Sequence, residues 1–88
     1  MEFEVDKVEV FKSIFQKNQS KITEQEGCYG VQLFQDINES NIFFTFSKWE
    51  SQTHLDRYRE TELFKGVWTQ TKKLFCNKPM VWSIQEIL

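Results

Sequence analysis

The chain has 88 residues, which fits a single domain spanning residues 1–88. Eleven Lys and Arg residues oppose thirteen Asp and Glu residues, so the net charge is −2. This balance excludes a nucleic-acid binder that relies on a basic surface, and it excludes a polybasic membrane-surface protein. The chain is 40% apolar and 27% charged, as in globular domains, while its 16% aromatic content predicts an interior filled with rings.

The N-terminus shows no targeting signal. Residues 1–6 lack a positive stretch followed by an apolar one, and no run approaches the length of a membrane span. We therefore expect a cytoplasmic protein. In that reducing compartment Cys28 and Cys76 are expected to be two free thiols. They lack CxxC spacing and there is one histidine, so we expect no metal site.

The first quarter of the chain predicts a short strand and a long helix. Residues 1–5 alternate in polarity, as in a strand. Asp6 with Glu9 three residues later resembles a capping box, so the helix is placed at 6–25, and Gly27 follows its end. An apolar stripe at helical spacing comprises Val8, Phe11, Ile14, Phe15 and Ile22.

A β-hairpin is predicted next. Residues 28–36 and 42–49 are rich in strand-forming residues and are joined by a short polar loop. In the second strand Ile42, Phe44 and Phe46 point to one side, whereas Phe43 and Trp49 point to the other. Both faces of this strand are therefore largely apolar, which indicates that neither face is simply exposed to water.

Two helices and a final strand complete the chain. Ser51 is a candidate N-cap for a short helix over 52–59, and Thr61 is a candidate cap for a longer amphipathic helix ending near 76–79. Pro79 cannot continue a helix, so residues 80–88 are predicted to form the last strand.

The predicted order is strand, helix, strand, strand, helix, strand. This βαββαβ order indicates an α+β, ferredoxin-like domain with an antiparallel four-stranded sheet. Its helices cover one face of the sheet only. The other face would expose more apolar surface than a monomer normally does. We therefore predict a homodimer that packs through the open sheet face.

Four segments carry a resemblance that extends over essentially the whole chain. They are residues 26–31 (EGCYGV), 43–51 (FFTFSKWES), 58–68 (YRETELFKGVW) and 75–83 (FCNKPMVWS). On these residues the chain resembles the antibiotic biosynthesis monooxygenase (ABM) domain family of dimeric α+β barrels. The resemblance implies a small cytoplasmic dimer with a pocket in each subunit between sheet and helices. Family members usually begin several residues earlier, so we expect the first strand here to be short and weakly paired.

The family includes cofactor-free oxygenases of quinol-like aromatics, heme-degrading enzymes and signal-molecule isomerases. The heme-degrading branch has an iron-ligating histidine where this chain has Trp68, and a tryptophan where it has Tyr58. An indole cannot donate a lone pair to iron, so we expect no cofactor.

Cofactor-free oxygenation needs a ring-lined slot, a hydrogen-bond donor and a group that stabilises an anion. Candidate slot residues are Phe44, Trp49, Phe64 and Trp68. Tyr58 would supply a hydroxyl and Arg59, or Arg57, a positive charge. His54 is the candidate general base, although its polar surroundings are also typical of a solvated helix residue. Phe64 and Trp68 are most simply explained as core residues.

Two functional hypotheses follow. The first is an ABM-like protein that binds a small hydrophobic or aromatic compound, with cofactor-independent monooxygenase chemistry on quinol-type substrates. The second is a non-catalytic ligand-binding or assembly module of the same fold. A further alternative is that the protein's own aromatic rings fill the pocket, which would leave no cavity between the last helix and the sheet.

Overall fold

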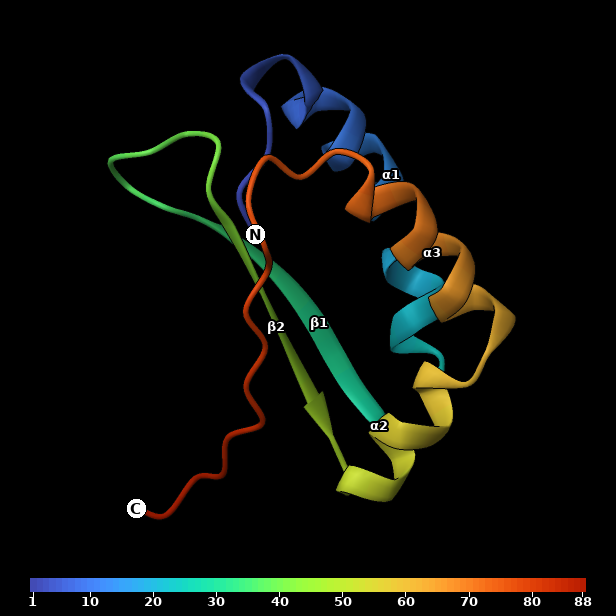
Figure 1. Cartoon of the computed structure of the whole chain (residues 1–88). Coiled ribbons are helices and arrows are strands. Elements are labelled where there is room, and N and C mark those ends of the chain that lie inside the picture. The colour runs from blue at the N-terminus through green and yellow to red at the C-terminus, as the bar shows by residue number, and fades with distance from the viewer.

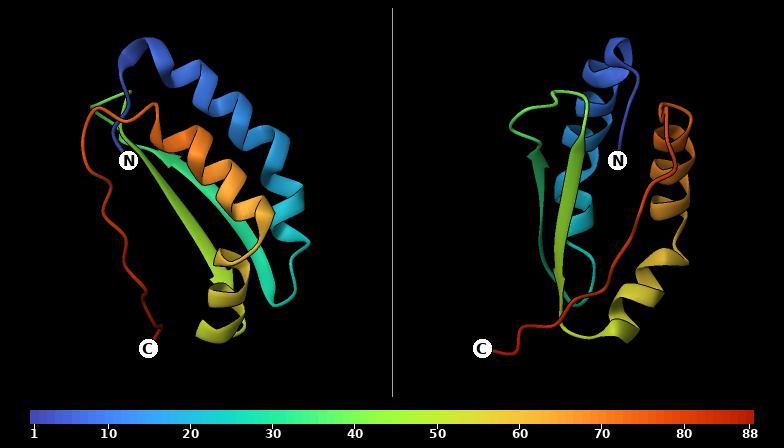
Figure 2. Two further views of the ribbon diagram at one scale, coloured as in Figure 1. Left: turned by 45° about the vertical axis from the view of Figure 1, so that its right-hand side comes forward. Right: turned by 60° about the vertical axis from the view of Figure 1, so that its left-hand side comes forward.

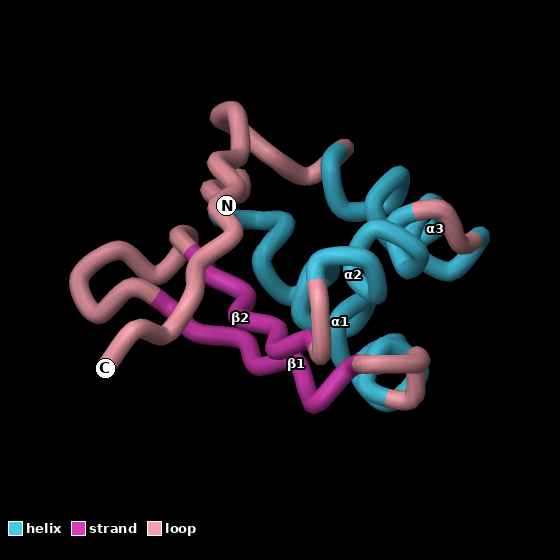
Figure 3. The backbone as a smooth tube through the Cα atoms, turned by 90° about the horizontal axis from the view of Figure 1, so that it is seen from below, coloured by secondary structure: helices cyan, strands magenta, loops and turns pink.

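The computed structural model describes all 88 residues as a β-hairpin with three α-helices gathered to one side of it (Figures 1 and 3). The elements are a 3₁₀ turn η1 (Val5–Lys7), α1 (Val8–Thr23), β1 (Cys28–Gln35), β2 (Phe43–Trp49), α2 (Gln52–Arg59) and α3 (Glu62–Lys72). None of the helices has the length and apolar character needed to cross a membrane. Helix α3 packs along α1, as Figure 2 shows.

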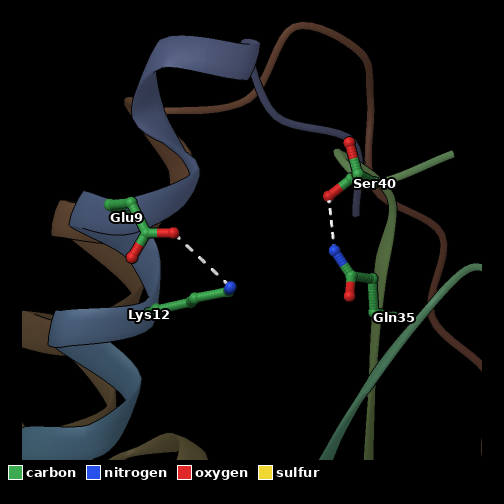
Figure 4. Close-up of polar contacts among 4 residues, drawn as sticks. All are labelled: Glu9, Lys12, Gln35 and Ser40. Carbon is green, nitrogen blue, oxygen red and sulfur yellow. Dashed lines mark hydrogen bonds and ion pairs between the residues drawn. The ribbon is translucent and has the colours of Figure 1, made fainter.

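Helix α1 confirms the predicted apolar stripe but not the predicted cap. Its N-cap residue is Lys7, which makes no side-chain capping bond, so the Asp6–Glu9 capping box is wrong. The chain enters the helix through η1 instead. Glu9 lies 3.5 Å from Lys12 Nζ on the helix surface, where an exposed ion pair adds little stability (Figure 4).

Strands β1 and β2 form the predicted antiparallel hairpin, in which Phe34 lies opposite Phe44. Two side chains fix its loop. Asp36 Oδ2 accepts the backbone N–H groups of residues 38 and 39, and Gln35 Nε2 donates to the Ser40 carbonyl at 2.8 Å (Figure 4). Such side-chain bonds replace ladder bonds where the backbone reverses.

Both predicted hydroxyl caps are confirmed. Ser51 Oγ accepts the backbone N–H of His54 at 3.3 Å and starts α2 at the predicted residue. Thr61 Oγ1 accepts the N–H of Phe64 at 3.1 Å and starts α3. Helix α3 ends earlier than predicted, at Lys72, because the following residues turn back to pair with the N-terminal segment.

The core is an aromatic cluster, as the composition predicts. Phe3 is fully buried and Phe43 is 2% exposed. The Phe3 ring stacks on Phe11 at 4.2 Å and meets Phe43 at 5.9 Å and Phe75 at 5.2 Å between centroids. The Phe3 ring therefore connects α1, β2 and the segment that follows α3.

The sheet is smaller than predicted, because it has two strands and not four. The predicted strand at 1–5 is reduced to two isolated bridges, Glu2 with Ile42 and Phe3 with Phe75. The predicted strand at 80–88 is wrong for this protomer, since these residues form no regular structure. The N-terminal segment lies between β2 and residue 75, where Glu2 pairs with Ile42 and Phe3 pairs with Phe75. This segment is too short to extend alongside residues 80–88, so these residues have no neighbouring strand.

Candidate functional site

Four of the predicted slot and donor residues lie in one row of rings. Tyr58 of α2 stacks on Trp49 of β2, with centroids 5.1 Å apart and an interplanar angle of 25°. Its other side meets the edge of Phe64 at 5.3 Å, and Phe64 lies 6.4 Å from Trp68. The site is therefore assembled where the C-terminal end of β2 meets α2 and α3.

This row continues into the core. Trp68 contacts Phe75 at 5.6 Å, and Phe75 contacts Phe3. None of the residues that line the two main cavities belongs to α3. This arrangement favours a packing role for Phe64 and Trp68. The residue of the row that lines a cavity is Tyr58.

A small polar cavity opens beside Tyr58. Its volume is about 200 Å³, and it is lined by Gln25, Glu26, His54, Arg57, Tyr58 and Thr61. Burial, assisted by the neighbouring Cys28 thiol, raises the pKa of Tyr58 to about 12. At neutral pH the phenol therefore keeps its proton and can donate it in a hydrogen bond, but it cannot act as a base.

His54 is held more firmly than its polar sequence surroundings suggest. Its side chain is only 18% exposed. Nδ1 lies 2.7 Å from Ser51 Oγ, and Nε2 lies 3.4 Å from Glu50 Oε2. The simplest proton assignment places the hydrogen on Nε2, toward Glu50, so that Nδ1 accepts the Ser51 hydroxyl proton. The result is a short Glu50–His54–Ser51 chain at the start of α2.

Gly27 lies directly against the His54 side chain. It has φ of +79°, and a Cβ atom built there would overlap the His54 ring. The Gly27 carbonyl accepts the backbone N–H of Glu50 at 2.7 Å, which ties this turn to the end of β2. A glycine is therefore required both by the backbone conformation and by the close approach of the ring.

Two predicted site residues lie apart from this cluster. Phe44 projects from the opposite face of β2 to Trp49, because side chains alternate along a strand, and it is 49% exposed. Arg59 is exposed at the end of α2 and does not line the cavity, whereas Arg57 does.

Sequence reasoning missed the partners of His54. The spacing contains the signal, since Glu50 and Ser51 lie four and three residues before His54 and a helix brings such positions together. Gln25 and Glu26, which line the opposite side of the cavity, follow α1 and carry no local signal. Cys28 and Cys76 are free thiols, as predicted. No group of three His, Cys, Asp or Glu residues is arranged to hold a metal ion.

The sequence model of the antibiotic biosynthesis monooxygenase family matches residues 1–68. No curated protein matches the chain significantly. The fold is similar to solved structures of low sequence identity. One is the crystal structure of an antibiotic biosynthesis monooxygenase, with a TM-score of 0.89, 15% identity, and coverage of 98% of this chain and 90% of that one.

Two further structures agree. A candidate antibiotic biosynthesis monooxygenase from Bordetella bronchiseptica has a TM-score of 0.87 and 18% identity, covering 100% of this chain and 91% of its own. One from Nitrosomonas europaea has a TM-score of 0.82 and 14% identity, covering 88% and 74%. At these identities the structures show a shared fold, and the family match covers well over half of the chain. The chain therefore belongs to the antibiotic biosynthesis monooxygenase family.

Proposed function

We propose that the protein is a homodimer that binds a small aromatic compound beside Trp49 and Tyr58 and oxygenates quinol-type substrates without a cofactor. The observation that carries this proposal is the cavity beside Tyr58, where the ring and protonated phenol of Tyr58 meet a guanidinium and an imidazole. A hydroquinone presents an aromatic ring and hydroxyl groups that match these partners.

The chemistry assigns a role to each group. A quinol must lose a proton before it is electron-rich enough to react with O₂. His54, which lines the cavity, would accept that proton at Nδ1 in place of the Ser51 hydroxyl hydrogen bond, and Glu50, whose Oε2 lies 3.4 Å from Nε2, would support the resulting imidazolium. The Tyr58 hydroxyl and the Arg57 guanidinium, both lining the cavity, would stabilise the quinol anion.

The exposed surface of the protomer supports the dimer. Its accessible area is 6732 Å², whereas a compact monomer of 10.7 kDa exposes about 5,500 Å². The excess of about 1,200 Å² exceeds the roughly 800 Å² that each partner buries in a standard interface. On the sheet face away from the helices, Phe34, Phe44 and Phe46 are 50%, 49% and 45% exposed, which marks this face as the place where two copies would pack.

A non-catalytic binding module is the second candidate function. It is favoured by the small size of the cavity, about 200 Å³, and by the continuity of the Phe64–Trp68 rings with the core. Ligand-binding pockets for drug-sized compounds are generally about 300–1,000 Å³.

The test is oxygen consumption with a panel of hydroquinones and anthrols. Tyr58→Phe removes only the hydroxyl and should lower kcat by about 100-fold, the effect of losing a donor to a developing anion. Tyr29→Phe is the matched control, because Tyr29 is 64% exposed and outside the cavity, and it should leave turnover unchanged. Binding without turnover would favour the module, whereas absence of both binding and turnover would refute the proposal.

A further inference from the structure

Three polar side chains at the start of α2 are arranged as a hydroxyl, a base and a carboxylate. Ser51 Oγ lies 2.7 Å from Nδ1 of His54, within the distance at which a base activates a nucleophile. Nε2 of the same ring lies 3.4 Å from Glu50 Oε2. With the ring hydrogen on Nε2, the Ser51 hydroxyl donates to Nδ1, and Glu50 is placed to stabilise the imidazolium that forms if this proton is transferred. These are the relations among a nucleophile, a general base and the group that orients the base.

Ser51 is accessible to a substrate although it caps the helix. Its Oγ accepts the backbone N–H of His54 at 3.3 Å, which is a long hydrogen bond. A hydroxyl oxygen has two lone pairs, so the cap occupies one of them and leaves the other for attack on a substrate. Ser51 is exposed, whereas the His54 side chain is only 18% exposed and lies against Gly27. The hydroxyl therefore faces solvent while its base is held in place.

The backbone of α2 provides donors for a developing oxyanion. The N–H groups of Gln52 and Thr53 have no hydrogen-bond partner within the protein, because the first residues of a helix have no carbonyl four residues before them in the helix. They lie at the positive end of the helix dipole. Acyl-transfer enzymes with a nucleophilic serine at the turn into a helix use the N–H of the next residue to stabilise the tetrahedral oxyanion. Gln52 occupies that position after Ser51.

The neighbouring cavity indicates which leaving group fits. His54 lines this cavity of about 200 Å³ together with Tyr58 and Arg57. A phenol with one ring matches these partners, because the ring can lie against Tyr58 while its oxygen accepts from the Tyr58 hydroxyl or the Arg57 guanidinium. A phenol has a pKa of about 10, as the tyrosine side chain does, so a phenolate leaves more readily than an alkoxide or an amine. The site is therefore suited to aryl esters and not to amides or alkyl esters.

We propose that the protein has an acyl-transfer activity, separate from the oxygenation, in which Ser51 is the nucleophile toward carboxylate esters of one-ring phenols. Oγ attacks the ester carbonyl carbon as Nδ1 of His54 takes the hydroxyl proton. The bond from this carbon to the phenol oxygen then breaks, the proton passes from His54 to that oxygen, and the acyl group stays on Ser51. Water attacks the acyl-serine with help from the same base, which releases the carboxylic acid and regenerates Ser51. No electrons are transferred, so the reaction needs no oxidant.

The first test traps the nucleophile. A fluorophosphonate probe forms an oxygen–phosphorus bond with an activated serine and releases fluoride, and mass spectrometry of the digested protein locates the adduct. We expect the adduct at Ser51. Ser51→Asp should show none, and it should keep the fold because aspartate caps a helix as well as serine does. Ser40→Ala, on the exposed hairpin loop, is the matched control and should be labelled like the wild type. A wild-type protein that is not labelled at Ser51 would overturn the proposal.

Hydrolysis of para-nitrophenyl acetate tests the base and the carboxylate. His54→Ala should slow the release of nitrophenol at least about 100-fold, the effect of losing a general base. Glu50 is a positioning residue, so Glu50→Ala should slow the release about fivefold. Glu50→Gln keeps an acceptor for the Nε2 hydrogen and should restore most of the rate; no loss in Glu50→Ala would exclude Glu50 from this role. Equal rates in wild-type and Ser51→Asp protein would overturn the acyl-transfer proposal, whatever the oxygen-consumption assay shows.

Discussion

Replacing Gly27 by alanine probes the part of the structure that holds His54. Gly27 has φ of +79°, and an added Cβ would overlap the His54 ring. The turn cannot easily move away, because the Gly27 carbonyl is bonded to the Glu50 N–H at 2.7 Å. The imidazole must therefore shift instead, and in shifting it leaves Ser51 Oγ.

The loss of stability expected for Gly27→Ala has two parts. The left-handed backbone conformation costs about 1–2 kcal/mol for a residue with a Cβ. Loss of the 2.7 Å contact between His54 Nδ1 and Ser51 Oγ adds about 0.5–1.5 kcal/mol. The contact with Glu50 adds little, because that carboxylate is 57% exposed. We expect Gly27→Ala to lower the free energy of unfolding by about 1.5–3.5 kcal/mol.

The change in the free energy of unfolding is measured by urea unfolding followed by tryptophan fluorescence. All variants are compared at one protein concentration, because the stability of a dimer depends on concentration. Gly66→Ala is the control for the substitution itself, because Gly66 lies inside α3 and has no neighbour within 4 Å of an added Cβ, so that change should not destabilise the protein. In a His54→Ala background the Gly27→Ala cost should fall by about 1 kcal/mol, because the bond to Ser51 is already absent. If Gly27→Ala costs the same in the His54→Ala background as in the wild type, the inferred packing of His54 against Gly27 is wrong.

Three further predictions follow from the same contacts. The Tyr58 pKa of about 12 exceeds its ordinary value of 10, so this group should leave stability constant below pH 10 and lower it as the pH rises to 12. The tyrosinate absorbance step near pH 12 should vanish in Tyr58→Phe; a step retained there would contradict the assignment. Thr61→Ala should cost about 1 kcal/mol in urea unfolding by removing the α3 cap, whereas Thr53→Ala, inside α2, should cost less. Phe3→Ala should cost about 3–5 kcal/mol, and Phe34→Ala, at 50% exposure, far less; equal costs would contradict the assigned core.

The parts of the fold that follow from neighbouring residues could be predicted from the sequence. Ser51 and Thr61 each cap the helix that begins after them, because a hydroxyl reaches the backbone N–H three residues on without help from the rest of the fold. The hairpin is local for the same reason, since its two strands are joined by a short loop that Asp36 closes. The family resemblance also rests on such local segments.

The candidate site could be predicted only in part. The sequence indicated that Tyr58 belongs to it, but the choice of Arg57 over Arg59 depends on how α2 is rotated against the turn that precedes β1. The presence of Gln25 and Glu26 in the cavity lining depends on where α1 ends relative to α2. Neither the rotation of α2 nor the position of the end of α1 can be predicted from a local sequence pattern.

What the sequence alone determined is the hairpin with its flanking helices, the aromatic core and the family. Only the tertiary structure decided that Phe44 and Trp49 serve opposite faces, that Gly27 confines His54, and that residues 80–88 remain unpaired in the protomer. The physical reason is that a strand needs a partner. Alternating apolar residues make 80–88 able to pair, but whether they do is set by the backbone groups that another segment, distant in sequence, presents to them.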